Sequence, residues 1–216
     1  MKTDELIGFL STNIDQELPG KRRAGRDILL AGLASAALVV AIVTLLLGLR
    51  PDLVDRENLA FLVLKTGFAL SAALIAIWYL ARAARPGGEK QFSWALASLP
   101  FAGITALGIA HLSMAPTSHW QGLLLGDLWL ECLVAIPLIA TIPFVAMIWI
   151  VRRTSAPTNL VHAGALVGLA AGAVSAMGYA LHCVDDTLPF VALWYGGTIA
   201  LCTLAGALLG PRLLRW

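Results

Sequence analysis

The chain has 216 residues, of which 59% are hydrophobic and only 13% charged, and its mean hydropathy is +0.82. A soluble domain carries about a quarter charged residues; here the excess apolar residues fall in long blocks, which is typical of a membrane protein. The net charge of +2 gives no general affinity for nucleic acid, so we expect no direct nucleic-acid contact.

The first 27 residues form a polar segment that we predict to be a cytoplasmic tail. Apolar residues within positions 3–18 recur at the spacing of one helical face, which predicts a short amphipathic helix with an acidic opposite face. These apolar residues are Leu6, Ile7, Leu10, Ile14 and Leu18. A helix of this length is marginal alone in water. It lies either on the bilayer and the protein's own loops, or in the groove of a cytoplasmic partner, and the pattern leaves both open.

Six apolar windows follow the tail, and each is long enough to cross about 30 Å of hydrocarbon at about 1.5 Å per residue. They lie near residues 28–49, 59–81, 93–114, 128–151, 161–181 and 190–210. Proline or glycine in the connections stops the helices. We therefore predict an all-α polytopic membrane protein, with a six-helix transmembrane bundle over 28–211 and a short C-terminus at 212–216.

Lys and Arg are distributed unevenly over the two sides that alternating spans define. Twelve of the fifteen lie in the tail, the second and fourth connections and the C-terminus. The other side holds only Arg50 and Arg56, while Lys65 lies within a span. Loops rich in Lys and Arg remain in the cytoplasm, so both chain ends are predicted to be cytoplasmic.

Glycines recur four residues apart in the last two windows. They are Gly164, Gly168 and Gly172 in the fifth window and Gly206 and Gly210 in the sixth. Small residues at this spacing let helix backbones approach closely. We expect them to pack inside the bundle, and a dimer seam, with the chain as a homo-oligomer, is the second interpretation.

Two cysteines fall at the same predicted outer face and at similar depth. Cys132 follows Glu131 near the start of the fourth span, and Cys183 lies between His182 and Asp185 after the fifth. Thiolate, imidazole and carboxylate together suit soft or borderline metals, so we expect a transiently bound heavy-metal ion and no tightly bound cofactor. A disulfide on the oxidising side of the membrane and simple packing of small side chains remain alternatives.

Lys65 lies six residues inside the second predicted span. A buried ammonium is unfavourable, so it should pair with an acid or extend toward the interface. The carboxylates predicted to lie on the outer side are Asp127, Glu131, Asp185 and Asp186.

Several stretches are similar to those of a known family, NrsF, the negative regulators of sigma F. They are residues 1–7 (MKTDELI), 48–53 (GLRPDL), 183–186 (CVDD), 189–190 (PF), 194–195 (WY) and 210–216 (GPRLLRW). The resemblance implies a bacterial inner-membrane anti-sigma factor that holds an extracytoplasmic-function sigma factor inactive and releases it under stress, notably heavy-metal stress. The family's two functional cysteines match Cys132 and Cys183. Val184 and Asp185 replace the proline and glutamate of its Cys-Pro-Glu-Asp motif, which leaves the inducing signal open.

The sequence as a whole therefore favours a membrane regulator over an enzyme. An acidic, apolar-striped tail suits capture of a basic DNA-binding protein, because its carboxylates compete with DNA phosphate for the same surface. The alternative is a small membrane transporter or a thiol-dependent membrane redox protein. A transporter is expected to show internal repeats and a thiol oxidoreductase a CxxC pair, and the sequence contains neither.

Overall fold

The computed structural model describes residues 20–52, 56–83 and 93–215, and every regular element within these ranges is helical. Six helical segments are long and apolar enough to cross a membrane, which confirms the all-α architecture with six candidate spans. They are Ala24–Leu47, Asn58–Ala83, Ala95–Met114, Thr117–Thr154, Leu160–Tyr179 and Leu188–Leu213. The amphipathic helix predicted at 3–18 lies outside the described residues.

The elements follow one another with short connections. In chain order they are α2 (Gly20–Ile42), the π-helical turn η1 (Val43–Leu47), α3 (Arg56–Ala83), α4 (Trp94–Met114), the 3-10 turn η3 (Thr117–His119), α5 (Trp120–Leu125), α6 (Trp129–Thr154), α7 (Leu160–Tyr179), α8 (Leu188–Phe190), the π-helical turn η4 (Val191–Tyr195) and α9 (Gly196–Leu213). The last three form one continuous helical span.

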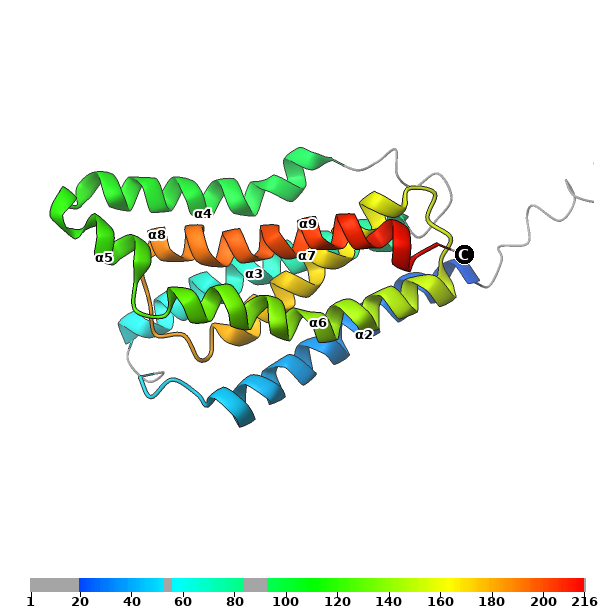
Figure 1. The fold of residues 1–216 in the computed structure, drawn as a ribbon, viewed down its shortest axis with the longest axis horizontal. Helices are drawn as coiled ribbons and strands as arrows, with labels where there is room; N and C mark the ends of the chain where they lie inside the picture. Colours follow the sequence, from blue (N-terminus) through cyan, green and yellow to red (C-terminus); the bar gives the residue numbers. More distant parts are fainter. Residues whose placement is uncertain (1–19, 53–55, 84–92, 216) are drawn as a thin grey trace, which may run out of the picture.

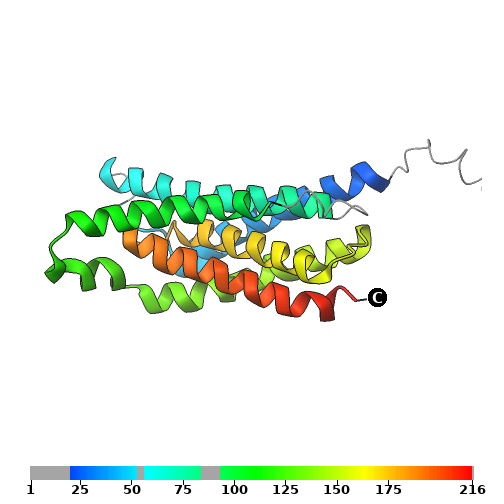
Figure 2. The ribbon, with the colours of Figure 1, turned by 90° about the horizontal axis from the view of Figure 1, so that it is seen from above.

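The long helices run roughly along one axis, and successive ones point in opposite directions (Figures 1 and 2). Helix α7 is the central helix, since 78% of its span is buried against 17% for α4 at the edge of the bundle. It packs against α2, α3, α6 and α9. Its sequence is largely Ala, Gly and Val, and such small side chains allow four neighbours to approach one helix closely.

The glycines of α7 and α9 form a close helix contact in the bundle's interior. A Cβ on Gly206 would overlap the carbonyl oxygen of Gly164, and a Cβ on Gly168 would overlap the carbonyl oxygen of Cys202. These glycines therefore face the protein's own helices. The packing interpretation is confirmed, and the dimer seam is wrong for this surface.

Two element boundaries differ from the prediction. Helix α2 begins at Gly20, whereas the apolar window begins near residue 28. Lys and Arg are good helix formers, so a helix continues beyond the apolar stretch that a hydropathy window detects. The third connection also contains the short helix α5, which ends at Gly126 with φ +58°. Its six residues are too few for a periodic signal in the sequence.

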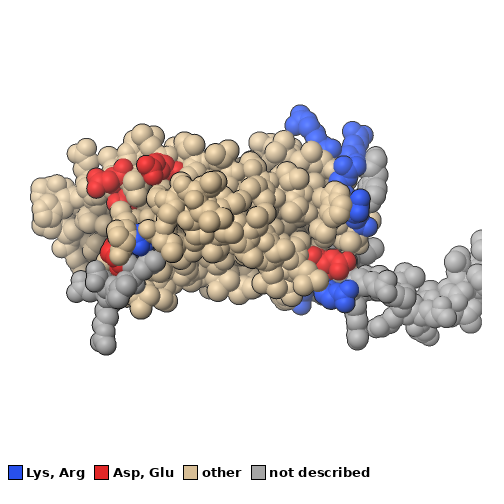
Figure 3. All heavy atoms as spheres, turned by 90° about the horizontal axis from the view of Figure 1, so that it is seen from below, with Lys and Arg blue, Asp and Glu red and all other residues tan. Residues whose placement is uncertain are grey.

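The bundle has two ends of different charge. We call the end where α2 begins and α3, α6 and α9 finish the basic end; it carries Arg26, Arg82, Arg152, Arg153 and Arg212. The opposite, cysteine end carries Cys132, Cys183 and most of the described carboxylates. On the face shown in Figure 3, Lys and Arg gather mainly at one end and Asp and Glu mainly at the other.

Candidate functional site: a cysteine pair beside a buried charge cluster

Cys132 and Cys183 are in contact at the cysteine end of the bundle. Cys132 lies in the first turn of α6, and Cys183 lies in the loop 180–187 between α7 and α8. Their Sγ atoms are 3.9 Å apart, both side chains are fully buried, and both thiols are free. The structure thus brings together the two residues that the topology placed at one depth.

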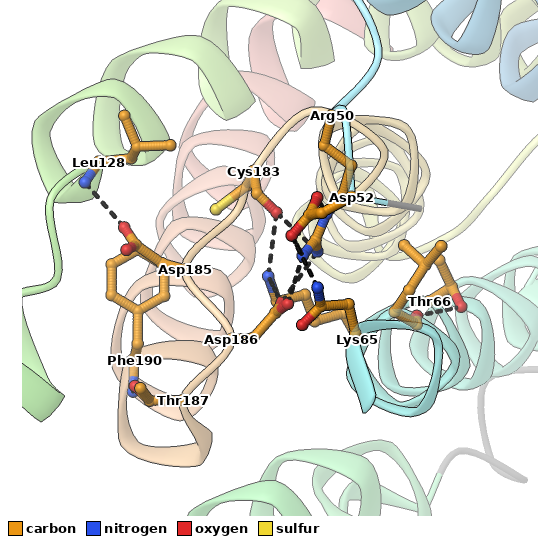
Figure 4. Close-up of polar contacts among 12 residues, drawn as sticks. Arg50, Asp52, Lys65, Thr66, Leu128, Cys183, Asp185, Asp186, Thr187 and Phe190 are labelled. Carbon is orange, nitrogen blue, oxygen red and sulfur yellow. Dashed lines mark hydrogen bonds and ion pairs between the residues drawn. The ribbon is translucent and has the colours of Figure 1, made fainter. Parts of the chain in front are cut away.

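Two cations hold the backbone of Cys183. Its carbonyl oxygen accepts hydrogen bonds from Lys65 Nζ on α3 and from Arg50 Nη1 in the loop after η1, each at 3.2 Å (Figure 4). The backbone N–H of Arg50 also donates to the carbonyl of Leu181 at 3.1 Å. The cysteine loop is therefore attached directly to α3 and to the end of α2–η1.

Asp186 links the same two cations through its side chain. It pairs with Lys65 Nζ at 2.5 Å and with Arg50 through two hydrogen bonds, of 3.1 Å to Nη1 and 2.5 Å to Nη2. Lys65 is fully buried and Arg50 is 3% exposed. The expectation that Lys65 pairs with one of four named carboxylates is confirmed, and the partner is Asp186. Arg50 lies in a polar connection, and no pattern in the sequence indicates its burial.

Asp52 balances the second positive charge of the cluster. Its carboxylate accepts from Arg50 Nε at 2.6 Å and Nη2 at 2.7 Å, and from Asn58 Nδ2 at 2.9 Å. The Arg50 guanidinium keeps the pKa of Asp52 below its ordinary value, and hydrogen bonds to Asp52 and Asp186 raise the pKa of Arg50. Two cations thus face two carboxylates, as a buried ion cluster requires for its stability.

The other polar residues predicted beside the cysteines have separate roles. Asp185 accepts from the backbone N–H groups of Asp127 at 3.1 Å and Leu128 at 2.8 Å, so it caps the start of α6 (Figure 4). His182 bonds the carbonyl of Gly48 at 3.1 Å and lies 4.0 Å from Glu131. Among the described residues, no group of three or more His, Cys, Asp and Glu side chains gathers into a metal site. Glu131, His182 and Asp185 therefore do not gather with the two cysteines into a set of metal ligands.

Two tyrosines that the sequence analysis did not consider complete the surroundings of the cysteine pair. Tyr179 and Tyr195 are fully buried, their ring centroids are 6.3 Å apart, and neither hydroxyl has a hydrogen-bond partner within the described part of the chain. Tyr179 lies four residues before Cys183, at the end of a helix. This helical spacing could have indicated that the tyrosine lies close to the cysteine. Tyr195, on another span, has no such signal.

The charges around Cys183 favour its thiolate. The hydrogen bond with Cys132 and the Lys65 ammonium lower the pKa of the Cys183 thiol, although burial acts in the opposite direction. Thiolates, not thiols, bind soft metals and react with oxidants. The two sulfur atoms are thus placed to bind one metal ion together or to form a disulfide. A disulfide requires them to approach to about 2.05 Å.

Comparison with known proteins gives the family. A family model described as negative regulator of sigma F, NrsF, matches residues 15–216. The chain belongs to the NrsF family. A probable anti-sigma-F factor NrsF of Azospira oryzae is 32% identical to this family member over 217 residues, and the anti-sigma-F factor NrsF of Caulobacter vibrioides is 31% identical over 221 residues. Both alignments cover 100% of each chain. No solved structure matches.

The family assignment confirms the resemblance that the sequence motifs suggested. The match includes both cysteines, the charge cluster and all six candidate spans, because it extends over almost the whole chain. The NrsF chain described here therefore shows how one member of the family arranges these residues in space.

Proposed function

We propose that this chain is a membrane-embedded anti-sigma factor of a bacterial inner membrane, which holds an extracytoplasmic-function sigma factor inactive until a thiol-directed stress signal arrives. The names of two full-length relatives support the anti-sigma role, and six long apolar helices support the membrane location. No observation gives comparable support to the transporter or the thiol redox enzyme.

The charge distribution supports one orientation. The basic end faces the cytoplasm, where loops rich in Lys and Arg remain, and the cysteine end faces outward. Helix α2 begins at the basic end, so residues 1–19, which precede it, emerge into the cytoplasm. The tail is then on the side of the membrane where a sigma factor is found.

The sigma factor binds the apolar face of this tail, formed by Leu6, Ile7, Leu10, Ile14 and Leu18. These residues lie outside the described part of the chain, and the proposal rests on their spacing in the sequence. An amphipathic helix docks its apolar face into a partner's groove. The acidic residues on the opposite face compete with DNA phosphate for the basic surface of the sigma factor.

The signal acts on Cys132 and Cys183. A soft divalent metal ion binds both sulfur atoms, and each thiol releases its proton as the metal–sulfur bond forms. The two residues come from α6 and from the loop after α7, so shared coordination changes how these elements meet. The alternative signal is an external two-electron oxidant such as a peroxide, which takes up two electrons as the two thiols lose their protons and form a disulfide.

The attachment of Cys183 to two other helices is the observation that carries the sensing proposal. Its carbonyl oxygen accepts hydrogen bonds from Lys65 on α3 and from Arg50 in the loop after η1. A displacement of Cys183 therefore displaces α3 and the α2–η1 helix, which is continuous with the tail. The metal shifts the protein between two arrangements only if it binds one more tightly than the other. The metal-bound arrangement is the one that releases the sigma factor.

A pull-down of the full-length protein from detergent extract tests the partner assignment. We expect a sigma factor to copurify. Replacing Leu6 and Leu10 together by Asp should weaken that interaction more than about a hundredfold, because burial of each leucine contributes roughly 1.5–3 kcal/mol. The matched control is Thr12→Asp, which adds charge on the opposite helical face and should retain the partner. Equal recovery with the double variant would place the binding surface elsewhere.

A further inference from the structure

Two of the chain's three tyrosines have buried hydroxyl groups without a hydrogen-bond partner. Tyr179 and Tyr195 are fully buried, and no described residue bonds either hydroxyl. The third, Tyr79, is also buried, but its hydroxyl accepts a hydrogen bond from the backbone N–H of Ser93 at 3.2 Å. A buried hydroxyl that makes no hydrogen bond destabilises the folded protein, because it has lost its hydration without compensation. An unpaired group of this kind often marks the place of an ion or a ligand.

Both tyrosines come from helices that meet at the cysteine pair. Tyr179 is the last residue of α7, and its carbonyl oxygen accepts a hydrogen bond from the backbone N–H of Cys183 at 3.1 Å. Tyr195 is the last residue of η4, within the last span. Each hydroxyl interacts electrostatically with both thiols. The interaction of Tyr179 is stronger with Cys132, and that of Tyr195 is stronger with Cys183.

Aromatic and cationic neighbours hold the two rings in place. The ring centroid of Tyr179 lies 5.7 Å from that of His182 and 6.3 Å from that of Tyr195. The ring of Tyr195 also lies 6.5 Å from that of Phe190, and the Lys65 ammonium lies 5.7 Å from its centroid. Rings enclosed in this way cannot turn toward other partners without repacking of their neighbours. The hydroxyls are therefore held beside the cysteine pair.

The two sulfur atoms gain hydrogen-bonding capacity when they bind a metal ion. In the metal-free protein they share one hydrogen bond, with 3.9 Å between them. The positive charge of a bound soft metal ion replaces the thiol protons, so both sulfurs become thiolates and this bond is lost. The nearby Lys65 ammonium is already engaged by Asp186 and by the carbonyl of Cys183. The two tyrosine hydroxyls, by contrast, are donors without a partner in the described part of the chain.

We propose that Tyr179 and Tyr195 are positioning residues of the metal site, each donating a hydrogen bond to one of the two cysteine sulfurs when the pair holds a soft metal ion. The inference rests on the sensing role in the proposed function and adds two residues to it. Hydrogen bonds from neighbouring groups to metal ligands orient them and strengthen metal binding. The hydroxyls lack partners in the metal-free state and gain them in the metal-bound state. They therefore increase the difference in metal affinity between the two arrangements, which a switch requires.

Tyr179→Phe and Tyr195→Phe test the inference, because each removes one hydroxyl and keeps the ring. Full-length protein in detergent is titrated with Cd²⁺, whose binding to thiolates gives a near-ultraviolet charge-transfer absorption. We expect each variant to bind Cd²⁺ roughly tenfold more weakly than the wild type. Without metal, each should melt roughly 2–4 °C higher, because a buried unpaired hydroxyl has been removed. A role in packing alone would leave the Cd²⁺ affinity unchanged.

Tyr79→Phe is the matched control. It also removes a buried tyrosine hydroxyl, but one that accepts a hydrogen bond from Ser93. It should therefore melt at a lower temperature and bind Cd²⁺ as tightly as the wild type. Unchanged Cd²⁺ affinity in the Tyr179 and Tyr195 variants, or a lower melting temperature of both without metal, would overturn the inference and leave the sensing role intact. A wild-type absorption no greater than that of Cys132→Ser would overturn both.

Discussion

Arg50 and Lys65 are buried cations, and both pair with Asp186, a carboxylate distant from them in sequence. Lys65 is fully buried and pairs with Asp186, 121 positions later in the chain. A buried pair adds little net stability compared with a well-packed apolar replacement, but removal of one partner leaves an uncompensated charge. Removal of the Asp186 carboxylate should therefore destabilise the cluster most, because Asp186 contacts both cations.

Replacement of Asp186 by Asn should destabilise the protein by about 3–5 kcal/mol, since both cations lose a buried counter-charge. Thermal unfolding of the purified protein in detergent would measure this. The control is Glu131→Gln, since the Glu131 side chain is 58% exposed and 4.0 Å from its partner; its effect should be below about 1 kcal/mol. A similar loss in both variants would show that the cluster does not hold the cysteine loop.

The sequence predicted that Lys65 and the two cysteines were unusual, but not which atoms meet. A lysine within an apolar span signals a buried partner, yet four carboxylates were equally eligible. The choice of Asp186 depends on how the loop 180–187 turns, and the loop's turn is set by tertiary contacts such as that of Arg50 with Leu181. Asp185 illustrates the same limit, because its neighbour in sequence pairs with cations while it caps α6.

At the scale of the helices, apolar length predicted the number of spans and periodic glycines predicted a close contact. Apolar length can be counted along the chain, and the spacing of glycines indicates where two helix backbones can approach, so neither signal requires tertiary detail. The signals fail where a helix leaves the apolar region, as at the start of α2, and where the helix geometry changes, as in η1 and η4. π-helical turns are rare and occur mostly as single turns within longer helices.

Gly206→Ala in α9 should destabilise the bundle by about 1–3 kcal/mol or more, because the added Cβ would overlap the carbonyl oxygen of Gly164 and force α7 and α9 apart. Gly197→Ala in the same helix meets no atom within 4 Å and should be neutral or stabilising by up to about 1 kcal/mol. Unfolding in SDS titrations distinguishes the two. Equal behaviour would contradict the close α7–α9 contact.

For the whole molecule, the charge asymmetry predicts its orientation. Reporter fusions at Arg85 and Arg153 should give a cytoplasmic signal, and fusions near Thr117 and Thr187 an extracytoplasmic one, because Lys and Arg concentrate at the basic end. Alkaline phosphatase and green fluorescent protein fusions measure the two sides independently. A cytoplasmic signal at Thr117 would move the cysteine pair to the reducing side and remove the basis for sensing an external metal.

The cysteine pair links the outer signal to the tail in the proposed mechanism. Single Cys132→Ser and Cys183→Ser variants should still insert and still hold the sigma factor, since the tail is unchanged. Each should lose induction by a soft metal in a sigma-dependent reporter strain, because one remaining thiol cannot join the two elements. Both sulfur atoms belong to one site 3.9 Å across, so the double variant should be no worse than either single one.

Cys202 provides the matched control, because it is also buried but packs beside Ala140 and Ala171. Cys202→Ser should keep full induction, which separates loss of a particular thiol pair from loss of any buried thiol. Full induction in both single variants of the pair would rule out the pair as the sensor.

Arg50→Gln tests how the signal leaves the cysteine pair, because it removes the hydrogen bond from Arg50 to the Cys183 carbonyl and leaves both thiols in place. We expect this variant to lose induction because the metal-bound pair no longer acts on the α2–η1 segment. The two classes of variant differ in metal binding, which only the cysteine variants should lose, and this difference tests whether Arg50 acts after the metal has bound.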